Sequence, residues 1–454
     1  MPAISQADTL VERRLCALAT SEPASIWRAQ DELSKAVAEV GMHFEGRAYP
    51  VCLRPLAIDC DLGNHLGAVA EGVINLLDVA AELYCCNEEV QDLFPAYKHL
   101  RHWTTRLPEY RPIVRICRLD GLFGMDGHYK VIETNTEGPG GVIQNGLAAK
   151  VWSRVANPLV QGLALDVSRQ PFAKDPTCFV RELVSSYRVA TGRELRTAAV
   201  VNFRGRYTNE VDWIVNDLKL AGVKAELLDI TAMKRTPRGL VGPDGELIEL
   251  VYNKLDVREL INNEESSEYL ESCAHQEVIS INNWISQWIL SDKAMLAVLS
   301  DDRFRTNFSA KQATLIERHI PWTRLVKPGI TINPERSKIE LIDFIRENKA
   351  SLVLKPSNAT RGENVVIGRS TPPEVWEEHI GRAAHNPYVV QEYLRPGEIT
   401  ALQLPSRSIK KMGYGIDCYV FGGRLAGFQS RASVDSVMNV GRSGVLLPIA
   451  VTAA

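Results

Sequence analysis

Four polar side chains that together could hold a metal ion beside a phosphate group lie close together in the first third of the sequence. They are Arg118, Asp120, Glu133 and Asn135. Midway between them stands Asp126-Gly127, a dipeptide that favours the centre of a two-residue β-hairpin turn. A hairpin folded there pairs Asp120 with Glu133 and Arg118 with Asn135. Because side chains alternate faces along a strand, we predict that all four project from the same face.

The chemistry of these four residues follows from the short distance between the two carboxylates. Directly opposed residues have Cβ atoms about 4.5–5.5 Å apart, so Asp120 and Glu133 repel each other unless a positive charge lies nearby. A divalent cation removes the repulsion, and hard oxygen ligands on a rigid hairpin suit Mg²⁺. The guanidinium of Arg118 offers a fixed fork for a phosphate or a carboxylate. A solvated face carrying an Arg–Asp–Glu cluster is the alternative interpretation.

A second group of polar residues occupies the stretch Leu352–Gly368. Lys355 ends an expected strand and could place its ammonium group on phosphate oxygens. The loop Ser357–Asn364 contains small residues, among them Gly362, and its backbone N–H groups could close over the same oxygens. An ordinary hairpin is the alternative here.

Further elements are expected after this loop. Thr371 is predicted to cap a helix, with Pro372 at the first helical position and Glu374 completing a capping box. The run Tyr388–Leu394 has the composition of a strand. Gly422-Gly423 separates two strand-like runs and indicates a hairpin.

A βαβ unit is expected in the middle of the chain. Ala198–Phe203 and Ala225–Ile230 are apolar enough for buried strands, and Glu210–Ala221 is an amphipathic helix between them. This order implies parallel pairing of the strands. The turn Arg204–Asn209 lacks the pattern G-x-G-x-x-G, which argues against a dinucleotide site at that position.

Length and composition fit a soluble protein of about three lobes, at roughly 150 residues each. The chain has 454 residues, of which 45% are hydrophobic and 24% charged. Its formal charge of −3 argues against nucleic acid or an anionic membrane as a partner. No apolar run approaches roughly 18 residues and the start lacks a secretion signal, so we expect a cytoplasmic protein. The nine cysteines are scattered without a C-x-x-C pair and indicate neither disulfides nor a zinc site.

The pattern R-x-D…E-x-N-T…P-G-G resembles the metal-binding hairpin of the ATP-grasp superfamily, in which R-x-D precedes E-x-N-T-x-P-G. It is formed here by Arg118, Asp120, Glu133, Asn135, Thr136, Pro139 and Gly140. Gly138 is an additional residue before the proline and departs from the family pattern. The resemblance implies that Asp120, Glu133 and Asn135 hold Mg²⁺, or Mn²⁺ in its place. It also implies that Arg118 is a catalytic residue.

The resemblance extends to the second group of residues and implies contacts with ATP. Phosphate contacts are assigned to Lys355, Ser357 and Gly362, with Lys293 as a second lysine. The adenine slot is assigned to Gln391, Glu392, Tyr393 and Leu394, and the ribose to Glu398. Candidate phosphate or substrate contacts are Arg361, Arg431 and Asn439, and ordinary structural roles are the alternative for Arg431 and Asn439. A plain surface lysine is the alternative for Lys293, and a solvent-facing strand end is the alternative for Glu392 and Glu398.

The order of the two motifs is also informative. Most ATP-grasp proteins carry the phosphate loop first and the E-x-N hairpin last, whereas here Asn135 precedes Lys355. The chain therefore resembles the circularly permuted branch of the superfamily, and we expect an α/β chain with a circularly permuted α+β ATP-grasp fold. Permutation costs little where the termini lie at the surface and close together.

Four regions follow from these elements and from the resemblance. Residues 1–110 are expected to be mostly helical, as the apolar spacing over 65–84 indicates, and are a candidate substrate lid. Residues 111–160 form the part that contains the metal-binding hairpin. Residues 195–275 form a βαβ lobe that resembles a pre-ATP-grasp lobe. Residues 280–454 form the ATP-grasp nucleotide-binding lobe and the C-terminal strands.

The activity implied by the resemblance is that of an ATP-dependent carboxylate–amine ligase. A small carboxylate, such as an amino acid or a peptide-like acid, takes the γ-phosphoryl group and gives an acyl phosphate and ADP. An amine then displaces phosphate and leaves an amide. A phosphotransferase on the same fold and a non-catalytic nucleotide-binding protein are the alternatives. The expected partners are the two small-molecule substrates, and a homodimer is the default assembly.

Overall fold

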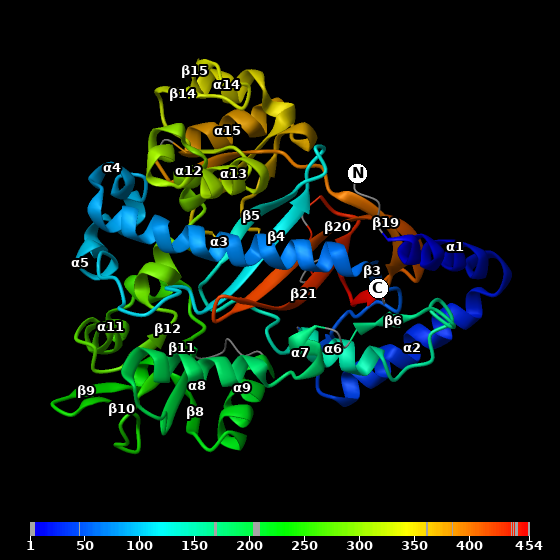
Figure 1. Cartoon of the computed structure of the whole chain (residues 1–454), viewed down its shortest axis with the longest axis horizontal. Helices are drawn as coiled ribbons and strands as arrows, with labels where there is room; N and C mark the ends of the chain where they lie inside the picture. Colours follow the sequence, from blue (N-terminus) through cyan, green and yellow to red (C-terminus); the bar gives the residue numbers. More distant parts are fainter. Residues whose placement is uncertain are drawn as a thin grey trace.

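The computed structural model describes residues 5–44, 46–167, 170–202, 209–359, 362–383, 385–436, 438, 440 and 444–452. The predicted site residues Arg361 and Asn439 lie outside the described residues, as does most of the turn 204–209. Three sheets of four or more strands carry the fold, and each occupies its own part of Figure 1.

The central sheet is antiparallel and contains six strands. They are β4 (Ile116–Phe123), β5 (Tyr129–Asn135), β19 (Gly397–Gln403), β20 (Ser408–Phe421), β21 (Arg424–Ser433) and β22 (Val445–Leu447). Their order is β22-β21-β20-β4-β5, and β19 pairs with β20 off this path. The hairpin predicted at Gly422-Gly423 is confirmed by the turn between β20 and β21. The sheet therefore places the β4–β5 hairpin, from the first third of the sequence, beside the β20–β21 hairpin near the C-terminus.

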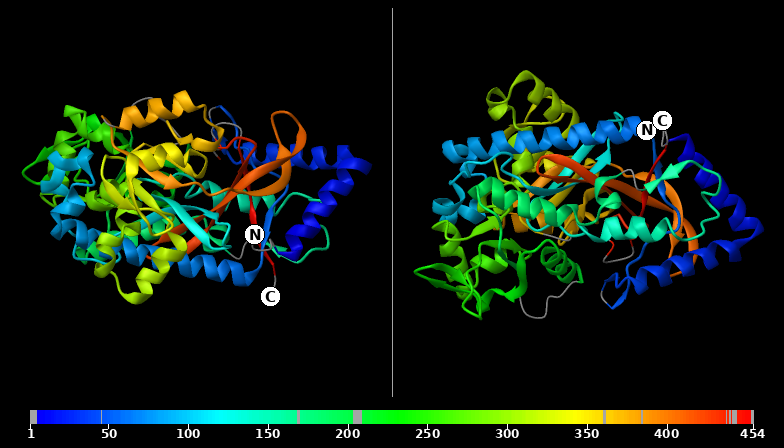
Figure 2. Two further views of the ribbon diagram at one scale, coloured as in Figure 1. Left: turned by 90° about the horizontal axis from the view of Figure 1, so that it is seen from above. Right: turned by 60° about the horizontal axis from the view of Figure 1, so that its bottom comes forward.

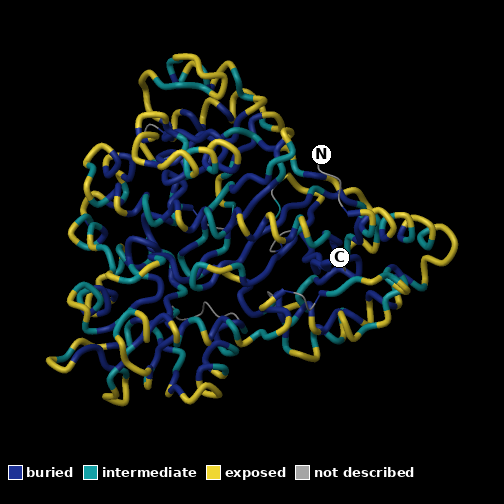
Figure 3. Tube along the Cα trace, viewed as in Figure 1, coloured by how far each residue is buried: buried dark blue, intermediate teal, exposed yellow. Residues whose placement is uncertain are grey.

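A long helix, α3 (Cys60–Cys86), lies across β20 and β21 (Figure 1). It contains the helix predicted over 65–84, and its N-cap Asp59 accepts a hydrogen bond from the Leu62 N–H at 2.7 Å. Gly63 of the helix lies against the Phe428 side chain. Phe428 points away from the face that carries Gln429 and Arg431, so α3 covers the opposite side of the sheet. Figure 3 shows the buried chain concentrated in this central layer.

Both ends of the described chain meet in one small sheet. The N-terminal region is mostly helical; it contains α1 (Gln6–Ser21), α2 (Pro23–Glu39), α4 (Glu88–Gln91) and α5 (Arg101–Thr104), with the short strands β1 (His43–Phe44), β2 (Arg47–Ala48) and β3 (Leu56–Ile58). Strand β3 pairs in parallel with β23 (Ile449–Thr452), which also pairs with β6 (Leu165–Asp166). The Ser5 hydroxyl donates to the Ala57 carbonyl at 2.7 Å. The two ends of the described chain consequently lie close together (Figure 2).

The βαβ unit predicted in the middle of the chain is confirmed. A parallel sheet has the order β12-β11-β7-β8. Its strands are β7 (Thr197–Asn202), β8 (Lys224–Asp229), β11 (Leu250–Asn253) and β12 (Ile279–Ile281). Its helices are α8 (Cys178–Thr191), α9 (Asn209–Leu220), α10 (Val257–Ile261) and α11 (Ser267–Ala274), and a hairpin of β9 (Lys234–Thr236) and β10 (Gly239–Val241) extends from it. Helices α6 (Gln144–Trp152) and α7 (Pro171–Lys174) precede this lobe.

The third sheet is antiparallel, with the order β13-β18-β16-β17. Its strands are β13 (Thr323–Leu325), β16 (Leu352–Pro356), β17 (Val366–Ile367) and β18 (Tyr388–Glu392). Around it lie α12 (Ala294–Ser300), α13 (Ala310–His319), α14 (Leu341–Glu347), α15 (Pro373–Ala383), and the hairpin of β14 (Ile330–Ile332) and β15 (Lys338–Glu340). Among the described residues, no helix combines the length and apolar character needed to cross a membrane.

The capping box predicted at the start of α15 is wrong. The helix begins at Pro373, one residue later than expected. The Thr371 hydroxyl donates to the Ile367 carbonyl at 2.7 Å. Thr371 therefore closes the turn after β17, and this local hydrogen bond takes the hydroxyl that the capping box would use.

Candidate active site

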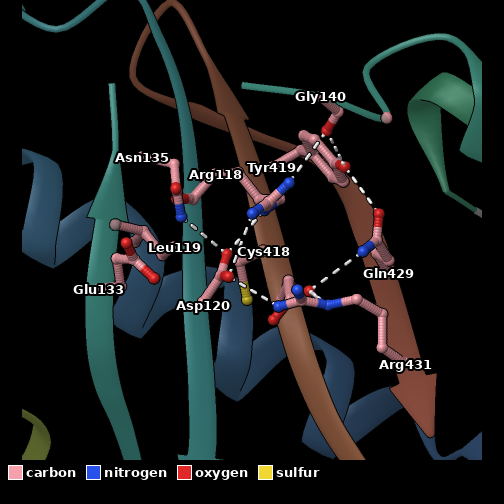
Figure 4. Close-up of polar contacts among 12 residues, drawn as sticks. Arg118, Leu119, Asp120, Glu133, Asn135, Gly140, Cys418, Tyr419, Gln429 and Arg431 are labelled. Carbon is pink, nitrogen blue, oxygen red and sulfur yellow. Dashed lines mark hydrogen bonds and ion pairs between the residues drawn. The ribbon is translucent and has the colours of Figure 1, made fainter. Parts of the chain in front are cut away.

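The β4–β5 hairpin brings the four predicted side chains together in the predicted pairs. Asp120 lies opposite Glu133, and Arg118 lies opposite Asn135. Paired residues of an antiparallel ladder point to the same side, so the four share one face of the central sheet. Figure 4 shows Arg118, Asp120 and Asn135 in contact, with Glu133 beside them.

The turn of the hairpin differs from the prediction, and a β-bulge compensates for the difference. The Gly124 N–H donates to the His128 carbonyl at 2.8 Å, so the loop holds the three residues Met125–Gly127 rather than two. Gly127 takes a left-handed φ of 79°, which glycine adopts without steric cost. The register shifts next to Asp120, where β5 carries one extra residue. These two deviations cancel, and the pairs at the site agree with the prediction for this reason.

Asp120 is the centre of a polar network (Figure 4). Its Oδ1 accepts from Arg118 Nε at 2.6 Å and from Asn135 Nδ2 at 2.9 Å. Its Oδ2 accepts from Arg118 Nη2 at 3.1 Å and from Arg431 Nη2 at 2.6 Å. An ionised carboxylate has about four lone-pair sites, and these four bonds use them. Burial raises the pKa of Asp120, but the two guanidinium groups more than offset this effect and lower the pKa to about 2.

The neighbouring strand adds a carboxylate that sequence reasoning missed. Asp417 of β20 lies opposite Asp120, so Asp417, Asp120 and Glu133 form a row across three adjacent strands. Arg431 joins two of them, because its Nε also donates to Asp417 at 2.8 Å. Burial raises the pKa of Asp417 to about 6, although Arg431 acts in the opposite direction. No local motif marks Asp417, since its position depends on pairing between strands far apart in the sequence.

A second set of hydrogen bonds ties this network to the loop that follows β5. The Tyr419 hydroxyl lies 2.8 Å from the Gly140 carbonyl, and Arg118 Nη1 donates to the same oxygen at 3.1 Å. Gln429 lies 2.8 Å from the Tyr419 hydroxyl and donates to Asp417 at 3.2 Å. These contacts hold the Arg118 guanidinium between Asp120 and the loop (Figure 4).

The same loop is anchored on the parallel sheet. Lys254, which directly follows β11, donates to the carbonyls of Gly138 and Pro139 at 2.8 and 3.1 Å. Gly138 has a left-handed φ of 51°, and a Cβ at this position would lie 2.6 Å from the Asn253 carbonyl oxygen. The residue that departs from the family pattern is therefore a glycine because the loop passes directly against β11.

Lys293 is buried, with 6% of its surface exposed, so the alternative of a surface lysine is wrong. Its Nζ lies 2.9 Å from Glu133 Oε1 and donates to the Ala359 carbonyl at 2.7 Å. Its backbone N–H donates to the Ser357 carbonyl at 3.0 Å. Lys293 thus joins the β4–β5 hairpin to the loop that follows Lys355.

Lys355 is held by a neighbouring glutamine. Its Nζ donates to Gln391 Oε1 at 2.6 Å, and Gln391 Nε2 donates to Thr323 Oγ1 at 3.1 Å. Burial lowers the pKa of Lys355 to about 8, although Glu133 acts to raise it. The Gln391 side chain, predicted to line the adenine slot, is buried here and positions the Lys355 ammonium group.

Seven charged side chains thus form one group, which we call the charged cluster. Its members are Arg118, Asp120, Glu133, Lys293, Lys355, Asp417 and Arg431. Four cations face three carboxylates, and one of these carboxylates has a raised pKa. The excess of positive charge suits a polyanion such as a triphosphate.

The remaining residues predicted for the adenine slot lie on or just after β18. The N–H groups of Glu392 and Tyr393 donate to carbonyls of neighbouring segments at 2.9 and 2.8 Å. Leu394 is buried, and its N–H makes no hydrogen bond within the described chain. Of these three backbone N–H groups, that of Leu394 is therefore the one available to a ligand.

The remaining residues predicted to contact ATP are not members of the charged cluster. The Ser357 hydroxyl donates to the buried Asp292 at 3.1 Å, and Gly362 takes a left-handed φ of 70° in the loop. Glu398 is exposed and pairs with Arg395 at 3.2 Å. No contact among the described residues joins Glu398 to the charged cluster.

Comparison with solved structures identifies the fold. The chain is similar to a glutathione synthetase-like effector from Globodera pallida in its apo form, with a TM-score of 0.63. The two are 14% identical, over 95% of this chain and 98% of that chain. The chain has an α+β ATP-grasp fold. Within this ATP-grasp fold, the charged cluster lies where the central sheet meets the third sheet.

Other matches cover less of the chain. A RimK domain ATP-grasp protein from Sphaerobacter thermophilus is 12% identical over 54% of this chain and 96% of its own, with a TM-score of 0.26. D-cycloserine synthetase DcsG is 18% identical over 53% of this chain and 76% of its own, with a TM-score of 0.25. Scores at that level do not by themselves establish a shared fold. No protein-family model matches the sequence, and no curated protein matches it.

Proposed function

We propose that this chain is an ATP-dependent ligase that joins a small carboxylate to an amine. The observation that carries the proposal is the charged cluster on an ATP-grasp fold. Residues from four separate parts of the chain converge there, and its excess of cations matches the negative charge of a triphosphate. The similarity to a glutathione synthetase-like effector supports an amino acid or a peptide-like acid as the carboxylate. The circular permutation, which the order of the motifs predicts, belongs to the same proposal.

The oxygen atoms of the hairpin fit Mg²⁺. Glu133 presents a carboxylate, and Asn135 presents an Oδ1 that accepts no hydrogen bond within the described chain. Both are hard oxygen ligands of the kind that Mg²⁺ prefers. Asp120 belongs to the predicted set, but Arg118, Asn135 and Arg431 already use its lone-pair sites. We therefore assign Asp120 the role of fixing the two arginines. Bound there, the ion would neutralise charge on the phosphate oxygens.

The proposed reaction has two steps. A carboxylate oxygen of the first substrate attacks the γ-phosphorus of ATP, the bond to the leaving ADP oxygen breaks, and an acyl phosphate forms. The amine then attacks the acyl carbon and loses a proton, while the bond to the phosphate oxygen breaks and phosphate leaves.

The chain contributes positioning and charge neutralisation to both steps. Lys355 and Lys293 would bind phosphate oxygens. Arg118 and Arg431 would stabilise the acyl phosphate and the negatively charged oxygen of the tetrahedral intermediate. This assignment requires no side-chain nucleophile.

We place the substrates between the charged cluster and the parallel sheet. In an open parallel sheet, ligands bind where the strand order reverses, at the carboxyl ends of the strands. That position here lies between β7 and β11, next to Lys254 and the loop that it anchors. The loop leads directly to Arg118 through Gly140.

The metal assignment is tested with Glu133→Ala. Because Glu133 is half-buried and not part of a core, we expect the variant to fold and to lose ADP formation at least a hundredfold. The measurement is ADP release from ATP and Mg²⁺ with a panel of amino acids and small acids, with hydroxylamine as the amine. The exposed Glu265→Ala on the βαβ lobe is the matched control and should be unaffected. Turnover near that of the unmodified protein at saturating Mg²⁺ would refute the metal assignment.

The products of the same assay test the reaction class. A hydroxamate together with ADP supports an acyl phosphate. AMP with pyrophosphate would indicate adenylation instead. ADP with a stable phosphorylated product, formed without hydroxylamine, would indicate a phosphotransferase.

A further inference from the structure

A crevice of about 310 Å³ opens between the N-terminal region and the central sheet. Its walls come from α2, from β2 and the segment after it, and from the turn that follows β19. They include Ser34, Arg47, Tyr49, Pro50, Leu404 and Pro405. The volume lies at the lower end of the range of roughly 300–1,000 Å³ that is typical of small-molecule sites. None of these residues belongs to the charged cluster.

One lining residue of this N-terminal crevice, Pro50, lies close to the charged cluster. The Leu446 N–H donates to the Pro50 carbonyl at 2.9 Å, and Leu446 lies opposite Arg431 in the β21–β22 ladder. Because adjacent strands are about 4.8 Å apart, two strand spacings, or roughly 10 Å, separate Pro50 from Arg431.

The electrostatics of Tyr49 agree with this placement. Burial raises the pKa of the Tyr49 hydroxyl to about 12, and Glu210 adds to the shift. The charges of Arg431 and Arg118 act on the same hydroxyl in the opposite direction. Tyr49, which lines the crevice, is therefore within the electrostatic influence of both arginines.

The lining of the crevice indicates the chemistry of its ligand. Arg47 is exposed, and its guanidinium forms no ion pair within the described residues. The other lining residues include Ser34 and Tyr49, whose side chains carry hydroxyl groups, and the apolar Leu404 and Pro405. None of the described residues that line the crevice carries a carboxylate. Such a site suits a ligand with an apolar portion that ends in a carboxylate, for which arginine is a well-matched partner.

We propose that the N-terminal crevice binds the distal end of one substrate and that this end is a second carboxylate, bound by Arg47. The proposal rests on the proposed function and names its substrate class. The reacting group of that substrate lies at Arg118 and Arg431, and its other carboxylate lies at the crevice. The substrate is then an amino-acid or peptide-like dicarboxylate.

The test is equilibrium binding to the full chain, which needs no turnover. The probes are dipeptides that contain Asp or Glu, each also prepared with one or the other carboxylate amidated, and titrated by calorimetry in the presence of ADP and Mg²⁺. At least one dipeptide should bind tenfold or more tightly than one of its two amides. Arg47→Gln should remove this difference by weakening the binding of the dipeptide but not that of its amide. Lys35→Gln, which removes an exposed cation beside Ser34 on the same helix, should leave it intact.

Two results would overturn the subsite. One is a preference for the free carboxylate that persists in Arg47→Gln, and the other is a set of dipeptides that bind no better than any of their amides. ATP affinity should be unchanged in both variants, so a general loss of binding would also contradict the assignment. The proposed function fails separately: tight dipeptide binding with no ADP release would reject the ligase and retain the subsite. ADP release without a preference for the free carboxylate would reject the subsite and retain the ligase.

Discussion

At the scale of single residues, the pKa of each group in the charged cluster depends on the balance between its burial and the charges of its neighbours. Asp120 is kept ionised by two guanidinium groups, whereas the ammonium group of Lys355 forms no ion pair among the described residues and donates to Gln391 and to the Ile132 carbonyl. The pKa of Lys355 consequently falls to about 8, close to the physiological range. A phosphate group beside Lys355 would favour its charged form and raise its pKa again.

This balance predicts a pH dependence of nucleotide binding. Below about pH 8 the free protein carries Lys355 in its charged form, and above this value the proton must be taken up when ATP binds. The affinity for ATP should therefore fall as the pH rises, by up to tenfold for each pH unit above 8. Titration calorimetry between pH 7 and 9.5 measures the slope. Lys355→Arg keeps the charge at all these pH values and should flatten the profile. An equal slope in both proteins would contradict the assignment.

At the scale of elements, the loop after β5 connects two sheets. Its carbonyls accept hydrogen bonds from Lys254 on one side and from Arg118 on the other. Gly138 allows this connection because the loop runs directly against the β11 backbone. The orientation of Arg118 therefore depends on the parallel sheet as well as on its own hairpin.

Gly138→Ala tests this connection. A side chain at a left-handed φ costs roughly 1–2 kcal/mol, and here the Cβ also meets the Asn253 carbonyl at 2.6 Å. We expect the free energy of unfolding to fall by about 2 kcal/mol or more and ADP release to fall at least tenfold. Gly127→Ala is the matched control, since its φ is also left-handed but nothing lies within 4 Å of the added Cβ. Urea unfolding and the ADP assay measure both, and equal losses in the two variants would reject the role of the loop.

At the scale of the whole molecule, the two ends of the described chain lie close together. Ser5 contacts Ala57, and the next residue along β3, Ile58, pairs with Val451 near the C-terminus. A short linker could therefore join the ends without strain. Joining them would allow the order of the motifs to be changed while all contacts at the charged cluster are kept.

A circular permutant tests whether the order of the lobes matters. We propose joining the termini with a short Gly/Ser linker and opening the chain between Asp175 and Pro176, so that the βαβ lobe comes first and the β4–β5 hairpin last. This permutant should fold and bind ATP within about threefold of the original chain, because the new ends lie between α7 and the α8 helix, outside every sheet. Circular dichroism and calorimetry give the result. Insolubility or a loss of ATP binding would show that the observed order is required.

The sequence alone determined the local geometry of the site. Alternation along the strands and the turn at Asp126-Gly127 placed Asp120 and Glu133 in one pair, although the true loop is longer and a bulge restores the register. The βαβ unit was also predictable, because amphipathic spacing and strand length are local properties. The capping box at Thr371 was not, since the hydroxyl finds a partner in the preceding turn.

Only the tertiary structure decided how the site is completed. Asp417, which no motif marks, lies opposite Asp120 on a strand far along the chain. Arg431 and Lys293, candidate contacts by resemblance, pair there with Asp120 and with Glu133. Local sequence carries no record of such pairings, because they depend on which strands become neighbours and on which buried charges must find partners. A buried carboxylate is stable only beside a cation or a donor, and the fold as a whole, rather than any motif, supplies those partners.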